Sequence, residues 1–186
     1  MTLNKILVHS MTFLLLVCST SIGHEKKWPE RRLRQAWPQA QSFTSKQVSL
    51  TSSQISELKS EGVQIDSKDR SPIFYFAQSK VTSGGKPQTL GLILFIDSYG
   101  ANGPMEITVG LSSDGLVQKI DIWEHTENSS VTKEAYLKQF IGKSSKDPML
   151  VNKDYQPVSE APKASESIAL AVQKALKISN VAFKKN

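Results

Sequence analysis

The chain has 186 residues, a formal net charge of +6 and one cysteine, Cys18. This length suits one domain with its own hydrophobic core, and a single cysteine excludes an intrachain disulfide and a thiolate metal site. The basic residues are spread along the sequence rather than concentrated with aromatic residues, which argues against nucleic acid as a partner.

Residues 1–23 have the pattern of an export signal. Lys5 supplies a positive charge, residues 6–17 are mostly apolar, and Gly23 ends a small-x-small pattern. We therefore expect a signal peptide cleaved after Gly23. The remaining protein would work in the periplasm or at the outer face of the cytoplasmic membrane. An uncleaved, membrane-associated anchor and a lipid attached to Cys18 are the alternatives.

Residues 24–70 form a basic and helical N-terminal segment. Between Pro29 and Trp37 we expect either a short helix or a basic linker. Thr51 and Gln54 have the spacing of a capping box, which predicts a helix that begins there. Gly62 is the residue type that commonly follows the last helical turn.

The domain itself is expected at residues 71–180, and it begins with strand patterns. Short runs rich in β-branched and apolar residues predict four antiparallel strands, at residues 73–77, 90–96, 107–111 and 117–122. Asp114-Gly115 lies between the last two and predicts a tight hairpin with positive φ angles at both residues.

Two helices are expected after the strands. Residues 132–141 and 163–177 carry apolar side chains at helical spacing, and Gly142 ends the first of them. Strands followed by separate helices indicate an α+β fold. We expect an antiparallel sheet of about four strands with flanking helices.

Two polar segments are candidates for a functional site. Residues 124–127, Glu-His-Thr-Glu, follow a predicted strand, where binding residues are often found. Residues 159–165 open the last helix, and the start of a helix can bind phosphate. The plainer explanations are an exposed strand end and ordinary capping, with Ser159 as the N-cap and Pro162 in the first turn.

The sequence does not predict an enzyme that acts alone. It contains no Gly-x-Ser-x-Gly, His-Glu-x-x-His or phosphate-binding-loop motif. His125 and Glu127 are the one weak acid–base pair, and their side chains share a face if the strand continues that far. At most we expect an electron-transfer module.

Several motifs follow one another in an order typical of a known family. The segment 124–127 resembles a Glu-containing segment of that family, 139–143 resembles Gln-Phe-x-Gly-Lys, and 159–165 resembles Ser-Gly-Ala-Thr-x-Thr/Ser-Ser. From Gly91 to Leu176 the chain thus resembles the FMN-binding domain of exported flavoproteins. Relatives include subunits of the sodium-translocating NADH:quinone reductase and of Rnf-type complexes.

This resemblance implies FMN as a cofactor and electron transport as the activity. It places cofactor-binding residues at Ser159, Ala161, Lys163, Ser165 and Glu127. It also implies a redox partner, either a membrane redox complex or an exported redox protein. The cofactor would supply the redox chemistry, and the protein would supply its position and electrostatic surroundings.

The sequence departs from the family at the flavin-attachment motif. In the family, a flavin transferase esterifies the Thr of Ser-Gly-Ala-Thr with the FMN phosphate. Here Pro162 occupies that position, Glu160 replaces the Gly, and Ala164 replaces Thr or Ser. Since Pro162 has no hydroxyl, we predict that FMN, if bound, is held non-covalently. A relative that kept the fold and lost the flavin, acting as a binding or structural partner, and a domain with an unrelated ligand are the alternatives.

Overall fold

The computed structural model describes residues 28–81 and 85–184. The expected signal peptide at residues 1–23 lies outside the described residues. None of the helices in the described ranges is both long and apolar enough to span a bilayer.

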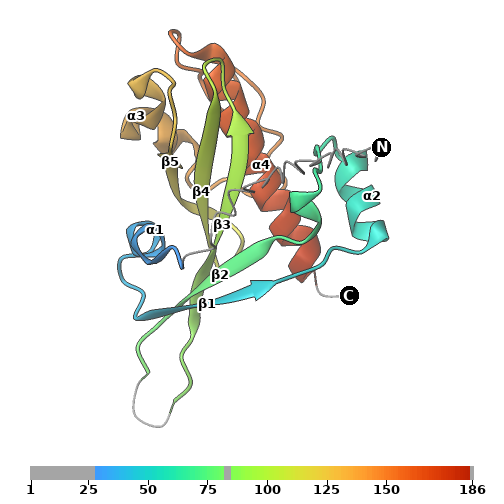
Figure 1. Ribbon diagram of the computed structural model, residues 1–186, viewed down its shortest axis with the longest axis vertical. Helices are drawn as coiled ribbons and strands as arrows, with labels where there is room; N and C mark the ends of the chain where they lie inside the picture. Colours follow the sequence, from blue (N-terminus) through green and yellow to red (C-terminus); the bar gives the residue numbers. More distant parts are fainter. Residues whose placement is uncertain (1–27, 82–84, 185–186) are drawn as a thin grey trace, which may run out of the picture.

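The fold is α+β, as the sequence predicts, with one antiparallel sheet in the order β1-β2-β3-β4-β5 (Figure 1). The strands are β1 (Ser42–Gln47), β2 (Ile73–Gln78), β3 (Thr89–Tyr99), β4 (Pro104–Ser112) and β5 (Val117–Trp123). The α-helices are α1 (Glu30–Ala36), α2 (Ser52–Ser60), α3 (Glu134–Leu137) and α4 (Pro162–Phe183). Short 3-10 helices occur at Lys68–Arg70, Ser129–Thr132 and Lys138–Phe140.

The sheet has five strands rather than the four expected. The additional strand, β1, lies at the edge and exposes every residue except the half-buried Phe43. A strand without alternating apolar residues leaves no period-two signal in the sequence. Because β1 pairs with β2, the sheet includes part of the segment before residue 71. The division of the chain at residues 70 and 71 stays a prediction.

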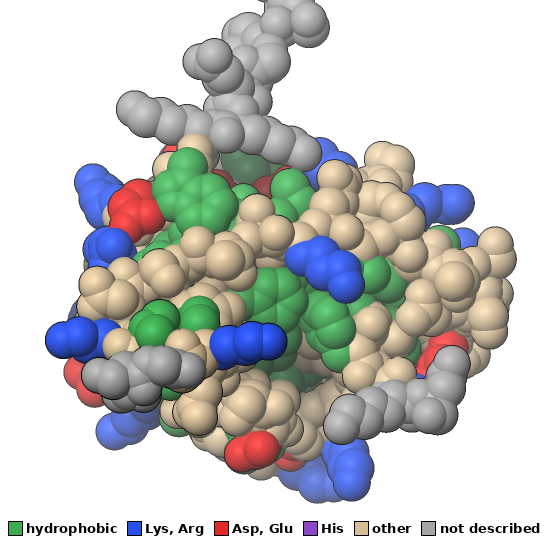
Figure 2. All heavy atoms as spheres, turned by 90° about the horizontal axis from the view of Figure 1, so that it is seen from below, with side chains coloured by type: hydrophobic (Ala, Val, Ile, Leu, Met, Phe, Trp, Pro, Cys, Tyr) green, Lys and Arg blue, Asp and Glu red, His purple; other side chains and the backbone are tan. Residues whose placement is uncertain are grey.

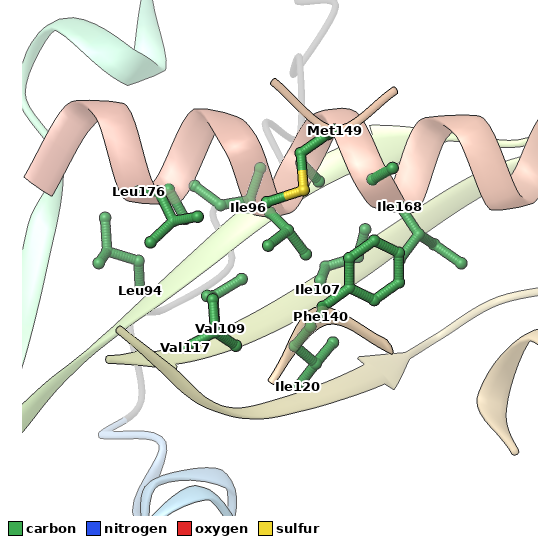
Figure 3. Packing of buried hydrophobic residues seen from close by; sticks show 14 of the residues in the cluster. Leu94, Ile96, Ile107, Val109, Val117, Ile120, Phe140, Met149, Ile168 and Leu176 are labelled. Carbon is green, nitrogen blue, oxygen red and sulfur yellow. The ribbon is translucent and has the colours of Figure 1, made fainter. Parts of the chain in front are cut away.

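Helix α4 covers one face of the sheet and forms the main core with it (Figure 3). Leu176 of α4 lies near Leu94 of β3 and Ile168 of α4 lies near Ile107 of β4, and all four are almost fully buried. Burial of each such side chain contributes about 1.5–3 kcal/mol. The predicted helix at 163–177 is confirmed and extends to Phe183.

Helix α1 covers part of the opposite face, so the linker interpretation of this segment is wrong. Leu33, Ala36 and Trp37 pack there against Ala77 of β2 and Ile93 of β3. The predicted capping box on α2 is also present. The Thr51 N–H donates to Gln54 Oε1 at 2.9 Å, and the Gln54 N–H donates to Thr51 Oγ1 at 3.2 Å.

Two local predictions are confirmed only in part, since the hairpin at Asp114-Gly115 and the helix within 132–141 are present but differ in detail. At the β4–β5 hairpin, Gly115 has a positive φ of 76° but Asp114 does not, and a bond from the Ser112 N–H to the Leu116 carbonyl closes a longer loop. The predicted helix at 132–141 begins later, at Glu134, because Lys133 has an extended backbone with ψ of 140°, and it continues after α3 as a 3-10 helix to Phe140. Gly142, with φ of 79°, ends this region as predicted.

Candidate functional site

The two predicted polar segments lie at the same end of the sheet, where β3 ends and α4 begins (top of Figure 1). Two hydrogen bonds fasten these elements together. The Ser98 hydroxyl donates to the Ser167 carbonyl at 3.1 Å, and the Ser167 hydroxyl donates to the Tyr99 carbonyl at 2.7 Å. The β3–β4 loop is therefore held against the first turns of α4.

The β3–β4 loop, residues 100–103, is tight because its two ends are bonded to each other. The Gly100 N–H donates to the Gly103 carbonyl at 2.9 Å. A Cβ on Gly100 would collide with the Glu127 carboxylate, and Gly103 has a φ of 150° that favours glycine. The backbone of Gly103 therefore favours glycine, whereas a side chain at Gly100 would have to displace the Glu127 carboxylate.

Glu127 anchors this loop from the segment after β5. Its side chain is buried, with 8% exposed. One carboxylate oxygen accepts the Asn102 backbone N–H at 2.6 Å and the other accepts the Asn102 side-chain amide at 3.4 Å. Thr126 adds a bond from its hydroxyl to the Asn102 carbonyl at 2.9 Å. The structure thus places Glu127, a predicted cofactor-binding residue, beneath the loop and bonded to it.

We expect Glu127→Ala to lower the free energy of unfolding by about 2–3 kcal/mol, because it removes a charge-assisted bond and leaves the Asn102 N–H without its acceptor. Urea denaturation measures the loss, and hydrogen exchange of the amides at 100–103 should speed up. Glu124→Ala is the control, since the Glu124 side chain is 71% exposed. An equal loss in both variants would show that Glu127 does not anchor the loop.

The residues before Glu127 do not form an acid–base pair with it. Strand β5 ends at Trp123, so His125 and Glu127 are not strand neighbours on one face. Glu124 has a left-handed backbone with φ of 50° and forms an ion pair with Arg32 of α1 at 3.0 Å. His125 Nδ1 is buried and has no hydrogen-bond partner among the described residues.

The start of α4 differs from the predicted capping. The N-cap is Ala161 rather than Ser159, and Pro162 is the first helical residue. The Ala161 N–H donates to the Val158 carbonyl at 3.0 Å, and the Ser165 N–H donates to Ala161 at 3.0 Å. Pro162 has no N–H. The backbone donors that remain to face a ligand are those of Lys163 and Ala164.

Ser165 is fully buried, and its hydroxyl is engaged twice. It donates to the Ala161 carbonyl at 2.9 Å and accepts the Val158 N–H at 2.9 Å. The Tyr136 hydroxyl donates to the Ser165 carbonyl at 2.9 Å, and burial raises the pKa of Tyr136 well above its usual range. Ser165 therefore braces the start of the helix and is not free to accept a covalent group. Sequence reasoning missed Tyr136 and Asn102, although Gly-x-x-Gly at 100–103 does indicate a tight loop.

The exposed residues at the start of α4 carry opposite charges. Ser159 and Lys163 are exposed to solvent. The pKa of Glu160 lies below its usual range. The largest cause is a hydrogen bond from the Glu160 backbone N–H to its own carboxylate, and the second is a hydrogen bond from the Ser159 side chain. Glu160 is consequently ionised at neutral pH and repels a phosphate, whereas Lys163 attracts one.

A cavity of about 290 Å³ borders this site between the end of β3 and the outer side of α4. Tyr99 and Leu170 line it and are unusually exposed for their types, at 71% and 54%. The cavity also has charged walls, with Lys174 bonded to Asp69 at 2.8 Å. Leu170 lies eight residues after Pro162, about 12 Å along α4, and the Tyr99 carbonyl is bonded to Ser167, five residues after Pro162.

The geometry suits a phosphate that is held without a covalent bond. Two backbone N–H groups and the Lys163 ammonium are suitable donors at the positive end of the helix dipole. The acceptor position has no hydroxyl, and Ser165 cannot replace it. Ser159 has a hydroxyl but lies before the helix, outside the acceptor position.

Comparison with known proteins agrees with this location. Residues 100–177 match the model of the FMN-binding domain family. The match contains both the 100–103 loop and the start of α4. No curated protein sequence matches the chain. Among solved structures, NqrC of Shewanella oneidensis is similar over 81% of this chain and 87% of its own length, with 12% identity and a TM-score of 0.49. That similarity is too low to assign a function.

Proposed function

We propose that this chain, whose residues 100–177 form a domain of the FMN-binding family, holds FMN non-covalently and serves as an electron-transfer module. The observation that carries the proposal is that the family match covers a phosphate-compatible helix start with no hydroxyl at the attachment position. The start of α4 supports both statements. Its free backbone N–H groups can bind a phosphate, and Pro162, which has no hydroxyl, cannot form an ester with it.

Three groups would hold the phosphate: the backbone N–H groups of Lys163 and Ala164, and the Lys163 ammonium. Ala161 at the N-cap has no side chain beyond its methyl group to obstruct an approaching phosphate. Tyr99 and Leu170 supply exposed aromatic and apolar surface beside the helix start. When bound, FMN supplies one- and two-electron chemistry, while these residues position it and exclude water.

The proposal places this module outside the cytoplasm, at the periplasmic side of the membrane. The signal-peptide pattern of residues 1–23 supports that placement. The redox partner would then be a membrane redox complex or an exported redox protein.

A second function is favoured by two particular residues. Glu160 repels a phosphate, and Pro162 cannot be esterified. Both features are expected in a member of the family that has lost its flavin. Such a protein would act as a binding or structural partner with the same fold.

The visible absorbance of the purified protein, before and after addition of FMN, separates these functions. A flavin band that stays with the protein through gel filtration supports the electron-transfer module. A folded, colourless protein that shows no saturable change in FMN fluorescence at micromolar to millimolar FMN contradicts it and supports the second function.

We expect Glu160→Gln to tighten FMN binding about fivefold, because removing one carboxylate near the phosphate removes roughly 1 kcal/mol of repulsion. A fluorescence titration with FMN measures the change. Glu166→Gln is the matched control, since Glu166 is an exposed acid within α4, after the helix start. An unchanged affinity in Glu160→Gln, or the same gain in both variants, would place the phosphate elsewhere.

A further inference from the structure

The β3–β4 loop contains the residue pair Asn102-Gly103. In such a pair the backbone nitrogen of the glycine can attack the side-chain amide of the asparagine, because glycine has no Cβ to hinder the approach. The other asparagines within residues 28–81 and 85–184 are Asn128, Asn152 and Asn180, which precede Ser, Lys and Val. Among the asparagines of these ranges, Asn102 therefore has the neighbour that hinders this attack least.

The structure leaves both reacting groups of this pair accessible. Asn102 is exposed, and the Gly103 N–H donates no hydrogen bond to any residue that the structure describes. The Asn102 Nδ2 donates to Glu127 Oε2 at 3.4 Å, which is longer than a usual hydrogen bond. A bond of this length restrains the side chain only weakly, so the amide carbon can turn toward the Gly103 nitrogen.

The other three asparagines are held in ways that oppose the reaction. The Asn128 side chain accepts the Ser130 N–H at 2.9 Å as the N-cap of a 3-10 helix. The nitrogen that would attack Asn152 belongs to Lys153, and its N–H is already bonded to a backbone carbonyl at 3.2 Å. Asn180 lies inside α4, where the following N–H is bonded within the helix. The fold thus adds to the preference that the sequence gives to Asn102.

We propose that Asn102 is a deamidation site and that its conversion releases the β3–β4 loop from Glu127. Hydroxide removes the Gly103 N–H proton, the nitrogen bonds to the Asn102 Cγ, and Nδ2 takes a proton from water and leaves as ammonia. Water then opens the resulting cyclic imide at one of its two carbonyl carbons, which leaves either aspartate or isoaspartate. The net reaction exchanges an amide for a carboxylate with water as the co-reactant, and it does not depend on flavin binding.

Either product breaks the contact that anchors the loop. The new carboxylate has lost the Nδ2 donor and lies against the carboxylate of Glu127, which is only 8% exposed. Two carboxylates this close repel each other strongly where water is excluded. Isoaspartate also adds a methylene to the main chain, which displaces the Asn102 N–H from its 2.6 Å bond to Glu127. The loop at residues 100–103 should therefore open.

The loop lies beside the candidate functional site, so its release would act there. It is at the top of Figure 1, at the end of the molecule that faces away from the viewer in Figure 2. Strand β3 leads into the loop and is fastened to the first turns of α4 through Ser98 and Ser167. Deamidation of Asn102 would consequently loosen the end of the sheet that adjoins the start of α4.

Incubation of the purified chain in mildly alkaline buffer, followed by peptide mapping with mass spectrometry, tests the site of the reaction. We expect conversion at Asn102 to be at least about tenfold faster than at Asn128 or Asn152, because only Gly103 leaves the attacking nitrogen unhindered. A methyltransferase specific for isoaspartate should label the same peptide. Equal rates at the three asparagines, or slower conversion at Asn102, would overturn the proposal.

An Asn102→Asp variant has the same side chain as one product and tests the release of the loop. Hydrogen exchange of the amides at 100–103 should become on the order of tenfold faster, because repulsion replaces a hydrogen bond to a charged group. Addition of Glu127→Gln should restore most of the protection, since the Gln amide can donate to the new carboxylate while its carbonyl accepts the N–H of residue 102. Unchanged exchange in Asn102→Asp, or no recovery in the double variant, would contradict release through Glu127.

Discussion

A Glu160→Gly, Pro162→Thr double variant should acquire one covalently attached FMN when it is produced and exported together with a flavin transferase, whereas the unchanged chain should acquire none. The variant restores a hydroxyl at the first residue of α4, and it also restores a backbone N–H there. It removes a carboxylate that is ionised at neutral pH next to the phosphate. Ala164 is left unchanged, because it is fully buried and a larger side chain would overpack the helix start.

Intact-mass spectrometry measures the attachment, and peptide mapping should locate the added FMN at residue 162. Glu160→Gly with Pro162→Ala is the control, because it has the same open turn without the hydroxyl and should gain no FMN. An FMN mass on the unchanged chain within residues 159–165 would contradict the assignment of Pro162 as the obstacle. A double variant that folds and binds FMN reversibly, but is never modified, would show that the transferase requires more than this hydroxyl.

Gly91→Ala should lower the free energy of unfolding by about 3 kcal/mol, because an added methyl group has no room at this position. Gly91 lies in β3 between the backbone of β4 and the Trp37 ring. An added Cβ would collide with the Leu111 carbonyl oxygen and with the edge of that ring. The carbonyl belongs to the β3–β4 ladder and cannot move without breaking sheet hydrogen bonds.

Gly110→Ala is the matched control for this prediction. Gly110 lies in β4 beneath the same Trp37 ring, but an added Cβ would meet its nearest neighbours, Lys119 Cβ and the ring, at 3.4 and 3.5 Å. Those are ordinary contact distances, so we expect a loss below about 1 kcal/mol. Urea denaturation gives both values. Equal losses in the two variants would attribute the effect to glycine itself rather than to the collision in β3.

If the fluorescence titration confirms FMN binding, one end of the sheet acquires a defined role. The end with the start of α4 and the Glu127-anchored loop then holds the cofactor. The interactions that hold α4 against the end of β3, through Ser98 and Ser167, keep the cofactor end rigid. A rigid site favours binding, since less conformational entropy is lost when the ligand is held.

Local sequence patterns determined most of the elements. The capping box at Thr51 and the 3.6-residue period after Pro162 depend on neighbours within one helical turn, so α2 and α4 could be predicted. The absence of a hydroxyl at residue 162 is likewise a property of one residue. It predicts the loss of covalent attachment without any knowledge of the fold.

The tertiary structure decided what depends on residues that are distant in the chain. Strand β1 is stabilised by pairing with β2 rather than by its own pattern, which is why the sequence predicted four strands instead of five. The hydroxyl of Ser165 resembles a free candidate in the sequence, but folding buries it between Val158 and Ala161. Glu127 likewise becomes an anchor because folding brings Asn102 to it from 25 residues away.

The distribution of charge shows the same division. The sequence determines the net charge of +6 and spreads the basic residues along the chain. Antiparallel pairing then places β1 and β2, neither of which contains an Asp or Glu, side by side at one edge of the sheet. Long-range pairing therefore gives the sheet an edge without carboxylates that sequence order does not reveal, because proximity in the fold depends on strand register and not on separation along the chain.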